Sequence, residues 1–191
     1  MREFVSGALA VAMLTASSPS MAHTENSNDE VHNSAGSAEL CVAVSDKVNS
    51  PKGGVRFAWE RIVRIWSGIG HHDQLSDKDV AQIGKMWRDK RTSLRCTQLG
   101  FSVTNGSIWK LGVERNSQDF LETALIDWQL SPNDMDCTGE TPLDYIEREL
   151  ITSKGTSRER FLKSYRDLFI EYGAKRASEL TPAERVGVGC P

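Results

Sequence analysis

The sequence lacks any apolar run long enough to cross a membrane. A spanning helix needs about 20 apolar residues, and the apolar stretch over residues 5–16 is shorter than that. Arg2 precedes this stretch, a Ser/Pro cluster follows it, and the small residues Ser20 and Ala22 stand three and one positions before His23. This pattern is typical of a secretory signal peptide and does not suit the alternative, a buried N-terminal helix. We therefore expect cleavage of residues 1–22, location in the periplasm of a Gram-negative bacterium, and no membrane insertion.

Positive charge is not in excess either. Lysine and arginine number 23 against 26 acidic residues, which gives a formal net charge of −3. Proteins that bind nucleic acids generally place a basic patch against the phosphates. A nucleic-acid partner is therefore not expected.

Familiar hydrolase motifs are also missing. The sequence has no Gly-x-Ser-x-Gly or His-Glu-x-x-His motif and no glycine-rich loop that could hold a phosphate at a helix start. The densest polar group, His71-His72-Asp73, could ligate a metal, but neighbouring residues rarely direct both imidazoles at one ion. The preceding glycines indicate an exposed loop. We predict no catalytic residue, no metal site and no cofactor, and keep a metal-dependent enzyme using His71, His72 and Asp73 as the alternative.

Four cysteines are present, and all follow the predicted cleavage site. They are Cys41, Cys96, Cys137 and Cys190. None belongs to a Cys-x-x-Cys pair, so a zinc or redox site is not expected. An even number of cysteines in an oxidising compartment predicts two disulfides, with three connectivities open.

The first half of the mature chain divides into a polar leader and a helical region. Residues 23–37 are rich in polar residues and are predicted to be disordered. From residue 38 onward apolar residues recur at helical spacing, and Ser76 with Asp79 forms a capping box. The clearest apolar stripe joins Val55, Ala58, Trp59, Ile62, Val63 and Trp66. Residues 38–103 are therefore predicted to be helical.

The second half repeats a pattern of two helices. A short helix over residues 107–113 precedes one capped by Asn116 with Asp119, and a short helix from residue 142 precedes one capped by Thr156 with Glu159. Gly173 follows the last helix as a C′ cap. Its predicted buried positions are Phe161, Leu162, Tyr165, Leu168, Phe169 and Tyr172.

Two segments resemble the ankyrin repeat. The run from Asp136 to Asp144, Asp-Cys-Thr-Gly-Glu-Thr-Pro-Leu-Asp, is similar to the turn and first helix of that repeat, and Tyr172-Gly173-Ala174-Lys175 is similar to its ending. Gly106 lies 33 residues before Gly139, which is the family period. About two repeats are recognisable, over residues 104–176. The resemblance implies an all-α fold, an α-solenoid, in which a helical cap (38–103) and ankyrin-like repeats with a C-terminal tail (104–191) form one compact domain.

The resemblance also implies a disulfide pairing. It places Cys137 in a finger loop, and a short helix begun by Thr181 would bring Cys190 close to that loop. This pairs Cys137 with Cys190 and leaves Cys41 with Cys96.

Ankyrin repeats bind proteins through their finger loops and concave face, and this implies a partner-binding surface here. The predicted surface residues are Ser131, Asn133, Asp134, Asp136 and Glu140. An acidic finger of this kind favours a basic partner and salt-sensitive association.

Together these features predict a non-enzymatic periplasmic protein-protein interaction module. Its most concrete form is an immunity protein that neutralises a toxic effector enzyme, so that the partner is a secreted toxin or another periplasmic enzyme. A periplasmic scaffold or accessory factor is the alternative within the same class.

Overall fold

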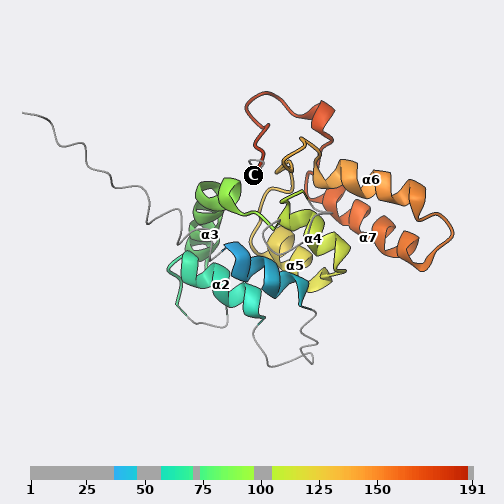
Figure 1. Cartoon of the computed structure of the whole chain (residues 1–191). Coiled ribbons are helices and arrows are strands. Elements are labelled where there is room, and N and C mark those ends of the chain that lie inside the picture. The colour runs from blue at the N-terminus through green and yellow to red at the C-terminus, as the bar shows by residue number, and fades with distance from the viewer. Residues whose placement is uncertain (1–36, 47–56, 71–73, 97–104, 189–191) are drawn as a thin grey trace, which may run out of the picture.

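The computed structural model describes residues 37–46, 57–70, 74–96 and 105–188, and in these ranges it is helical (Figure 1). The predicted all-α class is confirmed for this part of the chain. The signal peptide, nearly all of the predicted leader and the group His71-His72-Asp73 lie outside the described residues. Ser37, predicted to end the leader, is already helical.

The elements are a helix over residues 37–45, α2 (Ala58–Trp66), α3 (Asp77–Lys90), η1 (Arg91–Ser93), α4 (Ile108–Glu114), α5 (Gln118–Glu122), the π-helical turn η4 (Thr123–Asp127), α6 (Pro142–Thr152), α7 (Ser157–Glu171) and η5 (Ala177–Glu179).

Local capping signals explain where several helices begin. Ser76 and Asp79 form the predicted capping box of α3, because the Ser76 hydroxyl accepts from the Asp79 N–H and the Asp79 carboxylate accepts from the Ser76 N–H. Thr141 and Asp144 form a second box at α6, with Pro142 in the first turn, where its missing N–H costs nothing. Gly173 ends α7 with φ 82°, as the sequence predicts.

Two other predicted caps differ from the structure, one in its position and one in its hydrogen bonds. Helix α5 has Ser117 rather than Asn116 as its N-cap; Asn116 has φ 53° and accepts a hydrogen bond of 2.6 Å from the Tyr165 hydroxyl. At α7, Thr156 is the N-cap residue, as predicted, but its side chain makes no cap hydrogen bond. Glu159 instead accepts the N–H of Gly155 at 2.7 Å. In both cases a tertiary or neighbouring contact takes the side chain that sequence spacing assigned to a cap.

Two expectations near the C-terminal end also differ from the structure. Phe161, predicted to be buried, is 40% exposed, whereas the next residue, Leu162, is 1% exposed, because neighbouring residues of a helix point in different directions. The segment begun by Thr181 is a hydrogen-bonded turn rather than a helix, closed by contacts from Thr181 to the Glu184 carboxylate.

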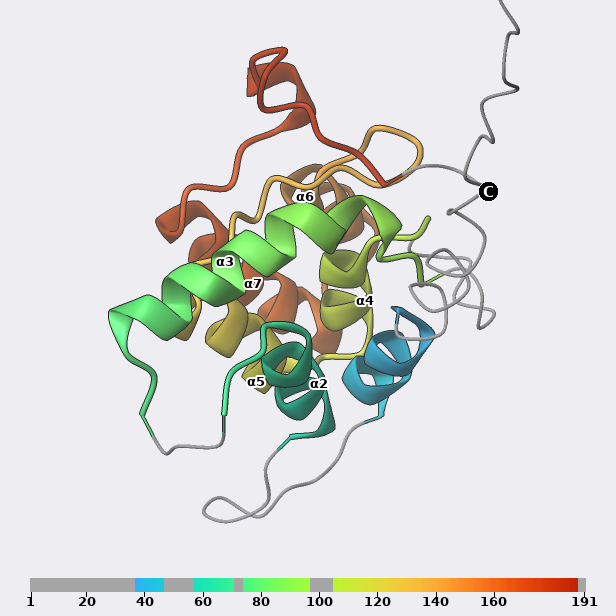
Figure 2. The ribbon, with the colours of Figure 1, turned by 90° about the vertical axis from the view of Figure 1, so that its left-hand side faces the viewer.

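The core is a continuous aromatic cluster that joins the two halves of the chain. The ring of Trp59 on α2 lies 5.5 Å from Phe120, and Trp87 on α3 lies 5.8 Å from Trp109 on α4. Trp109 in turn lies 5.8 Å from Phe169 on α7. Figure 2 shows α2 and α3 beside the α4 and α5 region, consistent with these contacts. Edge-on ring pairs of this kind add stability beyond the area they bury.

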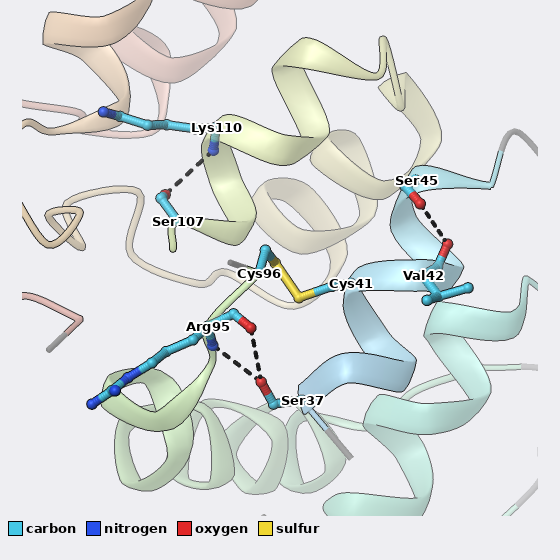
Figure 3. The surroundings of a disulfide bond; sticks show 8 residues. All are labelled: Ser37, Cys41, Val42, Ser45, Arg95, Cys96, Ser107 and Lys110. Carbon is cyan, nitrogen blue, oxygen red and sulfur yellow. Dashed lines mark hydrogen bonds between the residues drawn. A yellow bond between two sulfur atoms is a disulfide. The ribbon is translucent and has the colours of Figure 1, made fainter. Parts of the chain in front are cut away.

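A disulfide fastens the N-terminal helix to the segment after η1. Cys41 and Cys96 are joined, with Cα atoms 5.5 Å apart and both residues buried, as the sequence predicts (Figure 3). Next to it, the Ser37 hydroxyl accepts the N–H of Arg95 at 3.0 Å and donates to its carbonyl. The two segments are thus held by a covalent bond and by backbone contacts.

No helix within the described ranges has the length and apolar character that crossing a bilayer requires.

Helices α4 and α5 approach so closely that a glycine is required between them. A Cβ atom at Gly112 would lie 2.9 Å from Leu121 Cδ2 and 3.2 Å from Phe120 Cδ1. Both neighbouring side chains are fully buried, so they have no free space into which to move.

We expect Gly112→Ala to lower the free energy of unfolding by about 1–3 kcal/mol, the usual effect of overpacking a core. Gly84→Ala is the matched control, because a Cβ at Gly84, inside α3, makes only an ordinary contact of 3.6 Å with Arg88. That control should gain roughly 0.5–1 kcal/mol, the usual advantage of alanine over glycine in a helix. Urea unfolding of both variants checks the pair, and an equal gain in both would contradict the packing described for α4 and α5.

Candidate functional site

Three turn segments meet beside α4 and α6. The N–H of Cys137 donates to the carbonyl of Asn105 at 3.0 Å. Met135 exchanges two hydrogen bonds with the chain near the C-terminus, donating to Val186 at 2.9 Å and accepting from Val188 at 3.0 Å. We call residues 105–106, 131–140 and 186–188 the turn layer. It contains all five residues predicted to bind a partner.

A buried lysine holds the turn layer to α4. Lys110 is completely buried, and its Nζ lies 2.6 Å from Asp136 Oδ2 and also contacts Glu140. The same ammonium lies 5.0 Å from the centre of the Tyr145 ring, a cation–π contact. Arg148 on α6 completes the group through a contact of 2.9 Å with Glu140. We call Lys110, Asp136, Glu140 and Arg148 the ion cluster.

Asp136 is ionised within this cluster. Burial raises the pKa of its carboxyl, but hydrogen bonds from Lys110, from the Glu140 backbone and from Thr138 outweigh burial, so the net pKa is below the ordinary value. Its Oδ1 accepts from the N–H groups of Thr138 and Glu140 at 2.8 Å each. The pKa of Glu140 is likewise lowered, because Arg148 and Lys110 outweigh the effect of its burial. The Asp136 carboxylate therefore holds the turn through backbone hydrogen bonds and also neutralises the Lys110 ammonium.

Asp134 attaches the turn layer to the end of α3. It is 7% exposed, and its two oxygens accept from Trp87 Nε1 at 3.2 Å and from Arg91 Nη1 at 3.0 Å. Burial raises the pKa of Asp134, and the Arg91 charge opposes that rise. Its role in the fold is to bring the helical N-terminal half against the turn layer.

The residues predicted to face a partner therefore lie in different surroundings. Ser131 is exposed, whereas Asn133 is half-buried and bridges the Gly173 carbonyl and the Lys175 N–H at 3.0 and 2.8 Å. Asp134 and Asp136 are buried in ion pairs, and Glu140 is partly exposed while bound to Arg148. The turn layer therefore does not present an acidic binding finger, because Arg91 and Lys110 neutralise its buried carboxylates.

Sequence reasoning missed Lys110. The signal was present, since Lys110 stands between Trp109 and Leu111 in an apolar helix, where a charge must find a partner. Ser107 and Lys110 also have the Ser-x-x-Lys spacing of some acyl enzymes. Here the Ser107 hydroxyl caps α4 by accepting the Lys110 backbone N–H at 3.3 Å (Figure 3). Because Lys110 Nζ is bound to Asp136 and Glu140, the two residues serve as a helix cap and as part of an ion pair, and not as a nucleophile with its base.

Two further predicted sites include residues outside the described ranges. Cys137 is half-buried in the turn layer, and Cys190, its predicted partner, lies outside the described residues. The alternative metal site at residues 71–73 also lies outside them. Within the described ranges, histidine, cysteine and carboxylate side chains form no group of three that could hold an ion.

Comparisons of the chain with protein-family models, with curated proteins and with solved structures found no match in any of the three.

Proposed function

We propose that the protein is a non-enzymatic protein-protein interaction module that binds its partner through the exposed side of the turn layer. The observation that carries this is the fixation of the turn layer: the ion cluster holds residues 136 and 140 to α4 and α6, and backbone hydrogen bonds join the three loops to one another. Loops held in place before binding lose less conformational entropy when a partner docks. The exposed residues Ser131 and Thr138 lie on these fixed loops and are available to a partner.

We further propose that residues 104–176 form two ankyrin-like units. In support, α4 packs beside α6, and each is followed by the second helix of its pair. Gly106 and Gly139 both have positive φ, 88° and 86°, and they stand one repeat apart. The hydrogen bond between Asn105 and Cys137 links the two turns directly. The helical cap contributes the aromatic rings that cover the first unit.

Export into an oxidising compartment is part of the proposal. The signal sequence over residues 1–22 supports it, and the Cys41–Cys96 disulfide fits it. A second disulfide, Cys137 with Cys190, is also proposed. Its support is the bridge of Met135 with Gly187, since Cys137 and Cys190 follow these two residues closely in sequence.

The most concrete form of the function is immunity against a toxic effector enzyme delivered to the periplasm. Deleting the gene in the native strain tests it. The mutant should be killed by toxin-secreting sibling cells and rescued by the wild-type gene. Survival of the mutant beside those siblings would contradict immunity, and a growth defect in their absence would point to a scaffold or accessory factor.

Complementation with a matched pair of variants tests the binding surface. Ser131→Arg places a large charged side chain on the turn layer, whereas Ser164→Arg makes the same change at an exposed position of α7. We expect Ser131→Arg to lose rescue and Ser164→Arg to keep it, with both proteins at equal levels in the periplasm. Equal rescue by both would place the binding surface elsewhere.

A further inference from the structure

A polar cleft lies away from the turn layer, between α2, the start of α3 and η4. Its volume is about 590 Å³, within the range of about 300–1,000 Å³ that is usual for small-molecule sites. Leu75 and Val80 give it an apolar wall. Helices α2, α3 and α5, the last of which runs into η4, can be followed in Figure 2. No local sequence pattern indicates this cleft, because its walls come from three separate segments.

Two residues that line the cleft each carry a buried hydrogen-bond donor without an acceptor. Arg64 is 8% exposed, and its Nε and Nη2 hold Glu60 Oε1 at 2.9 and 2.8 Å, while its Nη1 is buried without a partner. Trp128 is 1% exposed, and its Nε1 is likewise buried without a partner. Both residues line the cleft. Buried N–H groups without an acceptor are rare in folded proteins. Neighbouring atoms cover these two donors, so a ligand oxygen in the cleft meets them when the Arg64 and Trp128 side chains turn toward it.

The cleft also carries an unneutralised carboxylate. Asp127, at the end of η4, lines the cleft and forms no ion pair within the part of the chain that the structure describes. Partial burial raises the pKa of Asp127, and the carboxylates of Glu60 and Glu122 raise it further. A cation placed there would be attracted to both Asp127 and Glu60. The cleft therefore offers one arginine and two acidic groups, which favours a ligand with charges of both signs.

The π-helical turn is what brings these groups to one place. Within η4 the Trp128 N–H reaches back five residues to the Thr123 carbonyl at 3.0 Å. This widened turn sets the positions of Asp127 and Trp128 relative to α2. π-helical turns occur frequently at functional sites.

We propose that the cleft binds a small ligand that carries a positively charged nitrogen and a carboxylate or carbonyl oxygen, the chemistry of a free amino acid or a short peptide. The ligand oxygen accepts from Arg64 Nη1 and Trp128 Nε1, and the ammonium faces Asp127 and Glu60. An apolar side chain of the ligand packs against Leu75 and Val80. Small side-chain adjustments of the kind common on binding complete the contacts. This site does not depend on the proposed partner-binding function.

Calorimetric titration of the full mature protein with L-leucine and with the dipeptide L-leucyl-glycine tests the proposal. We expect at least one of the two to bind with Kd on the order of 1 mM or tighter. 4-Methylpentanoate, which lacks the ammonium, and isoamylamine, which lacks the carboxylate, should bind at least about tenfold more weakly. The tighter of the two main ligands identifies the source as a free amino acid or a peptide. Absence of binding by both up to roughly 10 mM would overturn the proposal.

A matched pair of variants locates the binding in the cleft. Asp127→Asn removes the unpaired charge, and Glu122→Gln removes a neighbouring charge that does not line the cleft. We expect Asp127→Asn to weaken binding about tenfold or more and Glu122→Gln to change it less than about twofold. Both changes lie near the protein surface, and circular dichroism verifies that both variants fold. Equal affinities in the two variants would show that the ligand binds elsewhere and would refute the proposed site.

Discussion

Replacing Lys110 by methionine is expected to lower the free energy of unfolding by about 3–5 kcal/mol, the usual cost of removing one partner of a buried ion pair. Lys110 is completely buried and neutralises Asp136, whose side chain is also completely buried. Methionine fills a similar volume, so the loss comes mainly from the carboxylate left without its cation. Glu140 loses the same partner but keeps Arg148. Urea unfolding followed by far-ultraviolet circular dichroism measures the change.

Lys163→Met provides the control for this prediction. Lys163 pairs with Glu159 at 2.6 Å, but its side chain is 57% exposed. Exposed pairs contribute about 0–1 kcal/mol, so this variant should remain close to the wild type. If Lys110→Met were equally harmless, the ion cluster would not be what holds the turn layer in place.

The same cluster predicts a loss of stability in acid. The pKa values of Asp136 and Glu140 lie below their ordinary values of 3.8 and 4.5. A carboxyl whose pKa is lowered by folding stabilises the protein above its unfolded pKa, and this contribution disappears as the pH falls through the folded pKa. Stability should therefore be constant near neutral pH and decrease below about pH 4.5. Unfolding free energies measured from neutral pH to about pH 3 should show a smaller decrease in Lys110→Met than in the wild type, because the cation that lowers both pKa values is gone.

Removal of the disulfide with Cys41→Ala plus Cys96→Ala is expected to destabilise the protein by a comparable amount. The cysteines are separated by 55 residues. Closing a loop of this length lowers the entropy of the unfolded chain enough to contribute about 4 kcal/mol in the chain-entropy model. Small domains have total stabilities of only about 5–15 kcal/mol, so much of the molecule's stability depends on this bond.

Thermal and urea unfolding of the double variant measure this contribution. The single variants Cys41→Ala and Cys96→Ala serve as controls, because each breaks the same bond while removing only one sulfur from the core. All three should lose similar amounts. A double variant as stable as the wild type would show that the bond between the first helix and the segment after η1 does not limit unfolding.

Most helices could be predicted from the sequence because their signals are local. The capping pair Ser76 with Asp79 and the C′ glycine Gly173 act within a single turn, and both predictions are confirmed. Asn116 was assigned wrongly because its partner, Tyr165, is distant in sequence. The π-helical turn was also missed. The apolar residues around it recur at a spacing that fits an ordinary helix equally well, so the sequence pattern does not reveal the widened turn.

The candidate sites were harder to predict because their residues come from separate elements. Lys110 lies 26 residues from Asp136 in sequence, and no local spacing rule connects the two. The sequence pattern placed Asp134 and Asp136 in a polar loop, where exposure is the usual outcome. Their burial follows from cations on η1 and α4 that reach the loop from other parts of the fold. The cleft beside Arg64 requires the relative placement of three segments and had no signal in the sequence.

The proposal depends most directly on export into an oxidising compartment, where disulfides fasten both ends of a small helical binding module. Peptide mapping by mass spectrometry, without reduction, of the protein isolated from the periplasmic fraction of its native cells tests this. We predict a chain that begins at His23 and contains the Cys41–Cys96 and Cys137–Cys190 pairs. A chain that retains Met1, is found with cytoplasmic proteins and carries four reduced cysteines would contradict it.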